Sequence, residues 1–459
     1  MTGDTGEIKR INWTEYCSCV HLFRAFRMAI SPYRLGIAFA GLLALVLVGY
    51  GLDLISARSH GPVVVVSGGA SMSELDVFMA NNGDKAATLK WSEDAKTTGK
   101  RAGTFDTLLL QSRRITNNLT SSATSLSLAG ITDAIISIGR TKLWFIRMHT
   151  GFAIIFIIVS LAVWAMVGGS ICRLTALEIA RDERISPLEA VRFTREKFLS
   201  FLLAPVVPAG AILLGLIGLS LAGLIGGLIP WLGEIVVSLF FGIWILVGFF
   251  MALIIVGSIG GGWLMYPTIA VEGSDAFDAI SRSFGYLMAR PWRTMFYLLV
   301  SMVYGAICLT FVKIVARLTL ACTHAGLGVF WNVFKAKVTG GGEVGKLDAM
   351  WQAPNIDFVS NAYMGSFATE PVSTGQMIAQ YVVMGWVYGL AILVGAFVVS
   401  FAYSSFTIIY FLLRREVDAT GFDDVYLDDV GPSPAAPAPA PSGPQPGKSG
   451  TSLPIIGQP

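Results

Sequence analysis

Residues 274–312 read SDAFDAISRSFGYLMARPWRTMFYLLVSMVYGAICLTFV, and this stretch decides the fold. Its first half places apolar residues at helical spacing between charged ones, whereas residues 294–312 contain no charged side chain. A helix of about 20 apolar residues is long enough to cross the hydrocarbon core of a bilayer. The stretch therefore predicts an amphipathic helix, here called an elbow helix, that leads directly into a membrane-spanning helix.

The same arrangement occurs three times along the chain. Residues 21–33 precede an apolar run at 35–52, and residues 186–197 precede a run at 198–233. The second and third amphipathic segments, SPLEAVRFTREKF and SDAFDAISRSF, align weakly with each other. We interpret the pattern as an internal repeat of elbow helix and spanning helix.

The composition also indicates a membrane protein. Hydrophobic residues make up 54% of the 459 residues, charged residues make up 14%, and the mean hydropathy is +0.65. A soluble protein of this length needs more polar residues to cover its surface. The predicted fold is all-α, a polytopic membrane protein with six transmembrane helices and repeated amphipathic elbow helices. The predicted spans are residues 35–55, 149–172, 199–229, 235–265, 294–320 and 377–413.

The first half of the chain contains three further predicted segments. Residues 1–34 form a cytoplasmic amphipathic segment. Residues 56–148 form an extracytoplasmic loop that is partly helical, with one short strand at 62–67 and one helix at 105–138. The first internal elbow is predicted at residues 173–198.

The second half begins at a tight link, residues 230–234, which joins the third and fourth spans as a helical hairpin. The second internal elbow is predicted at residues 266–293, and a second extracytoplasmic loop at 321–376. Residues 414–459 begin with an acidic stretch and continue into a segment rich in Pro, Ala, Gly and Ser. Such a composition buries too little apolar surface to fold, so we predict a disordered cytoplasmic tail.

Lysine and arginine in short connections predict the orientation, because these residues stay on the cytoplasmic side. They are frequent before the first span, in both internal elbows and after the sixth span, and residues 230–234 contain none. The loop at 56–148 is basic in places, but it exceeds the length over which the rule holds. We predict a multi-pass protein with both termini in the cytoplasm.

The cations of the internal elbows are the strongest candidates for binding. A helix that lies in the headgroup plane with basic side chains can recognise anionic lipid or a partner helix. The same charges can also serve only to anchor the bundle by the positive-inside rule, and the sequence favours this second interpretation. Membrane lipids, and a cytoplasmic protein contacted by the tail, are the expected partners. The elbow cations are Arg192, Arg195, Lys197, Arg282, Arg290 and Arg293.

A glycine-rich segment near the end of the fourth span is a candidate hinge. Gly257, Gly260, Gly261 and Gly262 lie within six residues, and such a density of glycine weakens a helix or lets another backbone approach. The broken helices of transporters have this character. Plain close packing is the interpretation that the sequence favours.

Two patterns of small residues also favour close helix packing, or an oligomer seam. Gly218, Ala222 and Gly226 recur at four-residue spacing in the third span, and Gly385 and Gly389 do so in the sixth. Packing within one chain is the interpretation we prefer, and an oligomer is left open.

Ionisable residues inside a span would indicate a transport path, but the few in this chain lie near helix ends. Asp53 is predicted to pair with Lys313 or Arg317 at the outer edge, which would tie the first span to the fifth. We interpret this as a structural ion pair rather than a proton or ion relay.

Metal and catalytic chemistry have weak support. His60, His149, His324 and Cys322 would all lie at the outer edge, and such side chains could bind a transition metal if they converged. Their spacing is not a metal-binding motif, so we expect ordinary hydrogen bonds and no metal or cofactor. No catalytic motif is present in the sequence, so we predict that the chain is not an enzyme. The net charge of +3 is too small to indicate nucleic-acid binding.

Three segments carry a family resemblance. The first is residues 172–187, which begin with CRL and end with RISP. The other two are YPTIAVEGSDA at 266–276 and YFLLRREVD at 410–418. They resemble an uncharacterised family of six-helix bacterial membrane proteins of planctomycete type, similar in plan to the membrane domain fused to some glycerophosphodiester phosphodiesterases. The resemblance implies a six-helix architecture and a bacterial inner membrane. This chain has no soluble region large enough for the catalytic barrel of those enzymes, so their activity is not implied.

Two functions fit these patterns. The one we favour is a non-catalytic scaffold, assembly factor or lipid-interacting protein, because basic elbows and a tail are present and buried charge is scarce. The alternative is a transporter or channel for a small or lipid-like solute, with the glycine-rich segment as its hinge.

Overall fold

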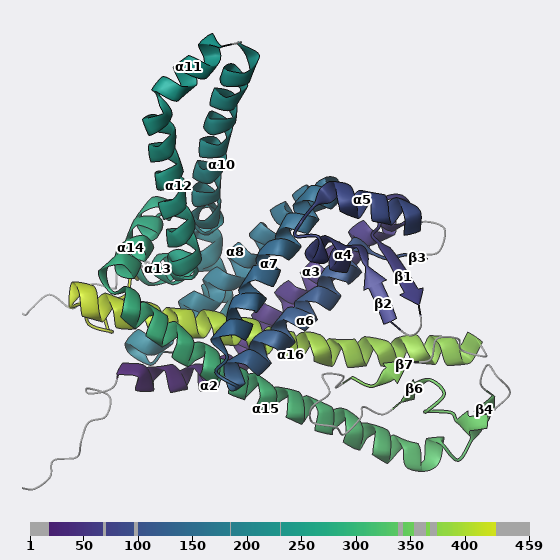
Figure 1. Ribbon diagram of the computed structural model, residues 1–459. Coiled ribbons are helices and arrows are strands. Elements are labelled where there is room, and N and C mark those ends of the chain that lie inside the picture. The colour runs from purple at the N-terminus through teal and green to yellow at the C-terminus, as the bar shows by residue number, and fades with distance from the viewer. Residues whose placement is uncertain are drawn as a thin grey trace, which may run out of the picture. The chain divides into compact units, whose positions relative to one another are not determined.

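The computed structural model describes residues 18–67, 70–95, 100–183, 185–229, 231–337, 343–352, 364–367 and 374–427. It is largely helical, and among these residues six helices are long and apolar enough to cross a membrane (Figure 1). The predicted all-α fold with six spanning helices is confirmed. The long helices are α3 (Pro32–His60), α8 (Thr150–Arg181), α10 (Phe198–Leu228), α12 (Phe241–Gly261), α15 (Pro291–Trp331) and α16 (Thr374–Asp418).

Helices α3, α8 and α16 pack against one another, and α16 also packs against α15. Ala38, Val167, Ile171 and Ala396 are buried where the three helices meet. Small side chains let the helix backbones approach, and van der Waals packing of this kind drives helix association in a bilayer. This contact is the centre of the bundle.

Each amphipathic segment forms a helix that ends directly before a long helix. Ser186 and Asp275 cap two of these helices, because their side chains accept the amide hydrogens of Glu189 and Asp278. The three units are α2 (Arg24–Ala29) before α3, with the 3₁₀ turn η1 (Ser18–Phe23) ahead of it, α9 (Pro187–Glu196) before α10, and α14 (Ala276–Ala289) before α15.

One additional helix follows α12. After the 3₁₀ turn η3 (Gly262–Leu264), α13 (Met265–Glu272) extends the chain toward α14. It ends at Gly273, whose φ of 63° is a left-handed conformation that glycine adopts without strain.

The link between the third and fourth spans forms a helical hairpin, as predicted. After α10 the chain turns at Trp231 and continues as α11 (Leu232–Leu239) and α12, and both helices contact α10 (Figure 1). Most apolar side chains of α10 and α12 are exposed in the single chain. A helix that is apolar on all sides is typical of a membrane span, where lipid covers this surface.

Several predicted boundaries are wrong. The second, fifth and sixth spans were expected to end at residues 172, 320 and 413, but α8, α15 and α16 continue to Arg181, Trp331 and Asp418. The predicted ends of the second and sixth spans lie directly before a charged residue, Arg173 or Arg414. Arg173 and Arg414 are instead buried by neighbouring helices, so the helix continues through both.

Residues 56–148 fold into a small sheet and four helices. The predicted strand at 62–67 is β1 (Val63–Ser67), which pairs antiparallel with β2 (Ala70–Ser73) on one side and β3 (Lys100–Arg101) on the other. The predicted single helix at 105–138 is wrong. The chain breaks there at Leu126, where φ is 53°, and Ser127 caps a new helix. The helices are α4 (Glu74–Ala80), α5 (Lys85–Asp94), α6 (Thr104–Thr124) and α7 (Leu128–Met148).

The segment between α15 and α16 contains two short antiparallel strand pairs. They are β4 (Lys335–Lys337) with β5 (Glu343–Gly345), and β6 (Trp351–Gln352) with β7 (Ser366–Phe367). At the other end of the chain, the predicted disordered tail from residue 428 onward lies outside the described residues. Its first part does not begin as a tail, because α16 extends to Asp418 and Val425 is buried.

Candidate functional site

The elbow helices meet the ends of the long helices in one region, which we call the junction. It comprises α2, α9, α13 and α14 together with the starts of α3, α10 and α15 and the ends of α8 and α16. Most of the charged side chains named above as candidates lie here, which makes the junction the candidate functional site.

Three buried arginines hold the junction together. Arg34 and Arg173 are only 2% and 3% exposed, and Arg414 is also buried. Arg34 Nη1 donates to the carbonyl of Met28 in the last turn of α2, over 3.0 Å. Arg173 Nη1 donates to the carbonyl of Ala270 in the last turn of α13, also over 3.0 Å. Carbonyls at helix C-termini lack partners within the helix, so each guanidinium stabilises the end of a short helix.

A carboxylate in α13 joins the second internal elbow to α16. Glu272 lies 2.9 Å from Arg282 Nε and 3.3 Å from Arg414 Nε, and it accepts a hydrogen bond from the Tyr410 hydroxyl over 2.5 Å. Its side chain is only 9% exposed. A buried carboxylate with several donors is held in one position, because breaking a buried ion pair is costly.

The end of α16 is fixed to α14 and α15 in the same way. The Tyr286 hydroxyl donates to Asp418, and the Tyr297 hydroxyl donates to Glu416 over 2.5 Å. Arg293 pairs with Glu416 at 2.8 Å. Burial, together with the Asp418 carboxylate that accepts its hydrogen bond, raises the pKa of Tyr286. The root of the tail is therefore attached to the third elbow unit.

The six elbow cations fall into two groups. Arg282 and Arg293 pair with carboxylates of the same chain, and Lys197 Nζ donates to the carbonyl of Gly273 over 2.7 Å. The other three are exposed and lie in α9 or at the end of α14. One of these, Arg192, pairs with Glu196 one helical turn away. The cations of this second group are Arg192, Arg195 and Arg290.

The glycine-rich segment packs against α14. A Cβ atom at Gly257 would lie 2.6 Å from the Phe284 side chain, and one at Gly260 would lie 2.7 Å from Leu287. At Gly261 the nearest atom would be the backbone carbonyl oxygen of Ser283, at 3.0 Å. The interpretation as close packing is therefore supported. Gly262, where a Cβ would meet nothing within 4 Å, begins the turn η3, and the hinge stays a prediction.

The other small-residue patterns give a mixed result. A Cβ at Gly226 would lie 3.2 Å from Val237 in α11, so this glycine packs within the α10–α11 hairpin. Gly218, Gly385 and Gly389 have nothing within 4 Å of such a Cβ among the described residues. A contact at these three positions would have to come from lipid, from another chain or from residues outside the described part of this one.

The predicted ion pair of Asp53 with Lys313 or Arg317 is wrong. Asp53 instead accepts the backbone amides of Phe105 and Asp106 at the start of α6, over 3.0 and 3.2 Å. Lys313 Nζ donates to Asn117 in the middle of α6, over 2.9 Å. A carboxylate at a helix N-terminus satisfies unpaired amides and the helix dipole. Helix α6 therefore lies between α3 and α15, and the two charges bind α6 rather than each other.

The histidines lie at separate places. His149 Nε2 is 3.4 Å from Glu74, which also accepts a hydrogen bond from Trp144, and His324 Nε2 is 3.0 Å from Asp348. Cys322 is exposed, and the side chain of His60 lies outside the described part of the structure. Among the described residues no group of three potential ligands could hold a metal ion.

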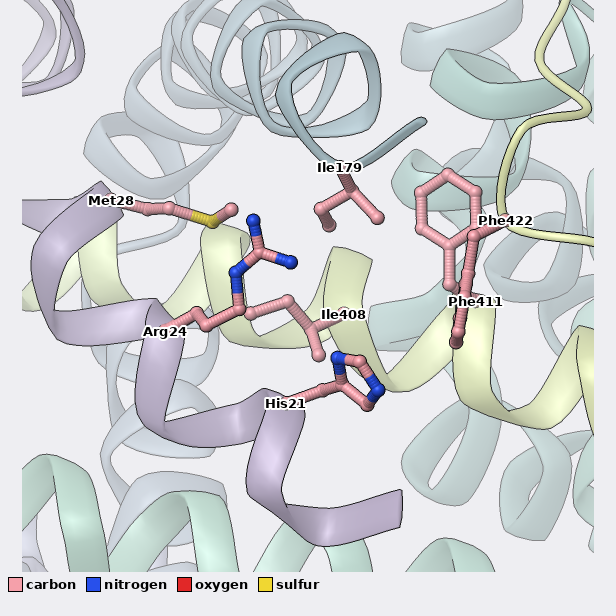
Figure 2. A pocket seen from close by; sticks show the side chains of 7 residues that line it. All are labelled: His21, Arg24, Met28, Ile179, Ile408, Phe411 and Phe422. Carbon is pink, nitrogen blue, oxygen red and sulfur yellow. The ribbon is translucent and has the colours of Figure 1, made fainter. Parts of the chain in front are cut away.

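Two cavities lie at the junction. The smaller, about 40 Å³, is lined by residues of η1, α2, α8 and α16 and by Phe422 (Figure 2). Within it the rings of His21 and Phe422 contact each other at a tilt of 54°, with centroids 5.2 Å apart. Burial, helped by the nearby charges of Arg24 and Arg415, lowers the pKa of His21.

The larger cavity, about 450 Å³, lies beside an ion pair between α3 and α8. Arg34 Nη2 and Glu178 Oε2 are 2.6 Å apart in this pair. From the sequence, Arg34 and Arg173 add only to the positive charge that predicts the orientation, and Glu178 and Glu272 belong to no recognised catalytic or binding motif. The sequence does show one carboxylate close to the end of an apolar helix. Burying a carboxylate there costs free energy unless a cation pairs with it.

Comparisons of this chain with protein-family models, curated protein sequences and solved structures found no match. The resemblance to the six-helix bacterial family therefore stays a prediction. The chemistry of the junction is that of binding and of holding helices in place. Most of its cations and carboxylates neutralise one another, and Arg192, Arg195 and Arg290 are exposed on its elbow helices.

Proposed function

We propose that this chain is a non-catalytic scaffold of a bacterial inner membrane that binds anionic lipid at its elbow helices. In this proposal both termini lie in the cytoplasm, and the tail is available to a cytoplasmic protein during assembly. The observation that carries the proposal is the exposure of Arg192, Arg195 and Arg290 on elbow helices whose opposite faces are buried in the bundle.

The position of these arginines supports lipid binding. Ala190 and Phe193 of α9, and Ala279 and Leu287 of α14, are buried against the long helices. The cations on the other faces lie where α10 and α15 begin, which is the level of the headgroups if these helices span a bilayer. A basic residue near an anionic membrane surface contributes about 1 kcal/mol.

The rigidity of the junction supports a scaffold role. Glu272, Arg414 and Glu416 tie α13, α14 and α15 to the end of α16, so the end of this helix is held in place. A partner that binds the tail would then be tethered to the end of α16. Buried ion pairs of this type are weak evidence for stability alone, which agrees with a positional role.

The test replaces the three exposed arginines and measures which lipids stay bound to the protein. The triple variant R192Q/R195Q/R290Q and the parent are extracted with native lipids in polymer-bounded nanodiscs, and the bound lipids are quantified by mass spectrometry. Each of the three arginines contributes about 1 kcal/mol, so we expect the anionic share of the retained lipid to fall by at least about fivefold, the effect of losing one of them.

The matched control is K85Q/K90Q, which removes two exposed cations from α5, far from the elbow helices in sequence. This variant should retain the parental lipid composition. Equal lipid composition in the triple variant and the parent would refute lipid binding by the elbow cations.

A further inference from the structure

The larger cavity at the junction has the size and composition of a ligand site. Its volume of about 450 Å³ lies within the range of about 300–1,000 Å³ that is usual for small-molecule sites. It is formed where α2 turns into α3, against α8 and the connection to α9. The lining residues are Ser31, Pro32, Tyr33, Arg34, Leu174, Glu178 and Ile185.

The wall of this cavity contains a buried charged pair that joins α3 to α8. Arg34 and Glu178 have side chains only 3% and 10% exposed, and their closest atoms are 2.6 Å apart. Burying two charges costs several kcal/mol each, and apolar residues of similar volume are often as stable. The pair holds α3 against α8, and its position in the cavity wall also places both charges beside a bound ligand.

The hydrogen bonds of Arg34 hold the pair in one orientation beside the cavity. Arg34 is fixed by the carbonyls of Met28 and Leu174, over 3.0 and 3.1 Å, in addition to Glu178. The bond from Arg34 engages Oε2 of Glu178, and among the described residues no donor bonds Oε1. A cationic group in the cavity could approach Glu178 while the guanidinium keeps its other bonds.

The remaining lining residues match an amphiphile. Pro32, Leu174 and Ile185 supply apolar surface, and Ser31 and Tyr33 supply hydroxyl groups. Tyr33 is about half exposed at the start of α3, and tyrosine is enriched at this depth in membrane proteins. An aromatic face also attracts an ammonium group. The cavity therefore combines a polar end with an apolar wall at the level where a span begins.

We propose that this cavity binds the headgroup of a zwitterionic phospholipid, with its ammonium group against Glu178 and Tyr33 and its phosphate against Arg34. A purely anionic headgroup is disfavoured because Glu178 would repel it, and a purely cationic one because of Arg34. This inference rests on the proposed lipid-binding function. It adds a zwitterionic lipid in the cavity to the anionic lipid proposed at the exposed elbow arginines. Free zwitterions share this headgroup chemistry, so the test must separate the two sources.

The experiment titrates the purified full chain in detergent with dihexanoyl-phosphatidylethanolamine and measures bound species by native mass spectrometry. We expect one saturable site. Glu178→Gln should weaken binding by about tenfold, the usual effect of losing a charge-assisted hydrogen bond. Ile185→Trp should abolish binding by filling the cavity while it leaves the ion pair intact. Leu188→Trp is the control, because Leu188 is 78% exposed on α9 and does not line the cavity.

Unfolding is checked by the melting temperature of each variant, and Ile185→Trp keeps the test decisive if Glu178→Gln does not fold. Parental affinity in Ile185→Trp would overturn the site. Equal affinity for dihexanoyl-phosphatidylglycerol would overturn the preference for a zwitterion, and equal affinity for free phosphoethanolamine would overturn the assignment to a lipid. The variant R192Q/R195Q/R290Q leaves the cavity unchanged, so loss of anionic lipid there and loss of phosphatidylethanolamine here are independent results.

Discussion

At the scale of single residues, the junction depends on arginines whose geometry lysine cannot reproduce. The guanidinium of Arg173 reaches the Ala270 carbonyl and also lies 4.1 Å from the centre of the Phe193 ring. A planar group can donate in its plane and stack on a ring at the same time, whereas an ammonium is a point charge. One side chain of α8 therefore positions both α9 and α13.

His21 gives a prediction for pH dependence. Its pKa lies below the ordinary value of 6.5, because burial and the charges of Arg24 and Arg415 disfavour the imidazolium. The unfolded segment therefore binds the proton first, so the stability of the docked segment is full above about pH 6.5 and is lost as the pH falls below it. We expect the amides of η1 and α2 to exchange faster with solvent at pH 5.5 than at pH 7.5, after correction for intrinsic rates.

The control for this prediction is His21→Phe, which keeps a ring beside Phe422 but cannot take up a proton. Its amide exchange, corrected in the same way, should not change with pH. A pH response of equal size in this variant would mean that another group is responsible.

At the scale of elements, glycines in α12 determine how closely α14 approaches. Gly257→Ala should place a methyl group 2.6 Å from Phe284, and overpacking of this kind costs about 1–3 kcal/mol. Gly262→Ala is the matched control, because nothing lies within 4 Å of the new methyl group. Thermal unfolding in detergent should show a lower melting temperature for the first variant and a parental value for the second.

The same pair of variants examines the alternative function. In a transporter with a hinge at this segment, Gly262→Ala would reduce flux in proteoliposomes although its stability is parental. If Gly257→Ala melts like the parent, the packing argument fails.

The elements also show what the sequence could reveal. The spans were predictable because a bilayer requires an uncharged run of a certain length, and the elbow helices were predictable from their periodicity. The end of α8 was not, because the burial of Arg173 depends on α13, about 100 residues later in the sequence. The partner of Asp53 was missed for a related reason. Its hydrogen-bond donors are backbone amides of α6, and no pattern of side chains in the sequence marks such donors.

At the scale of the whole molecule, the proposed orientation can be measured with Cys322. This residue is exposed and lies 31 positions after Pro291, about 47 Å along α15 at 1.5 Å per residue. It should therefore lie outside the hydrocarbon core, opposite the termini. In cells with a permeabilised outer membrane, a membrane-impermeant maleimide should label C17S/C19S at Cys322, because Cys172 and Cys308 are buried.

The control is the same variant with Cys322→Ser, which should remain unlabelled. Labelling of Cys322 only after the inner membrane has been opened would reverse the proposed orientation.

The length of the last two helices has a consequence for the space around the membrane. Helices α15 and α16 contain 41 and 45 residues, so each is more than 60 Å long at 1.5 Å per residue, about twice the thickness of the hydrocarbon core. Lys313 and Arg317 lie roughly 33 and 39 Å along α15, where a core of that thickness ends. The remaining turns of an upright α15 would rise roughly 20 Å above the lipid. Any cell-wall layer or second membrane on that side would have to lie at least this far from the bilayer surface.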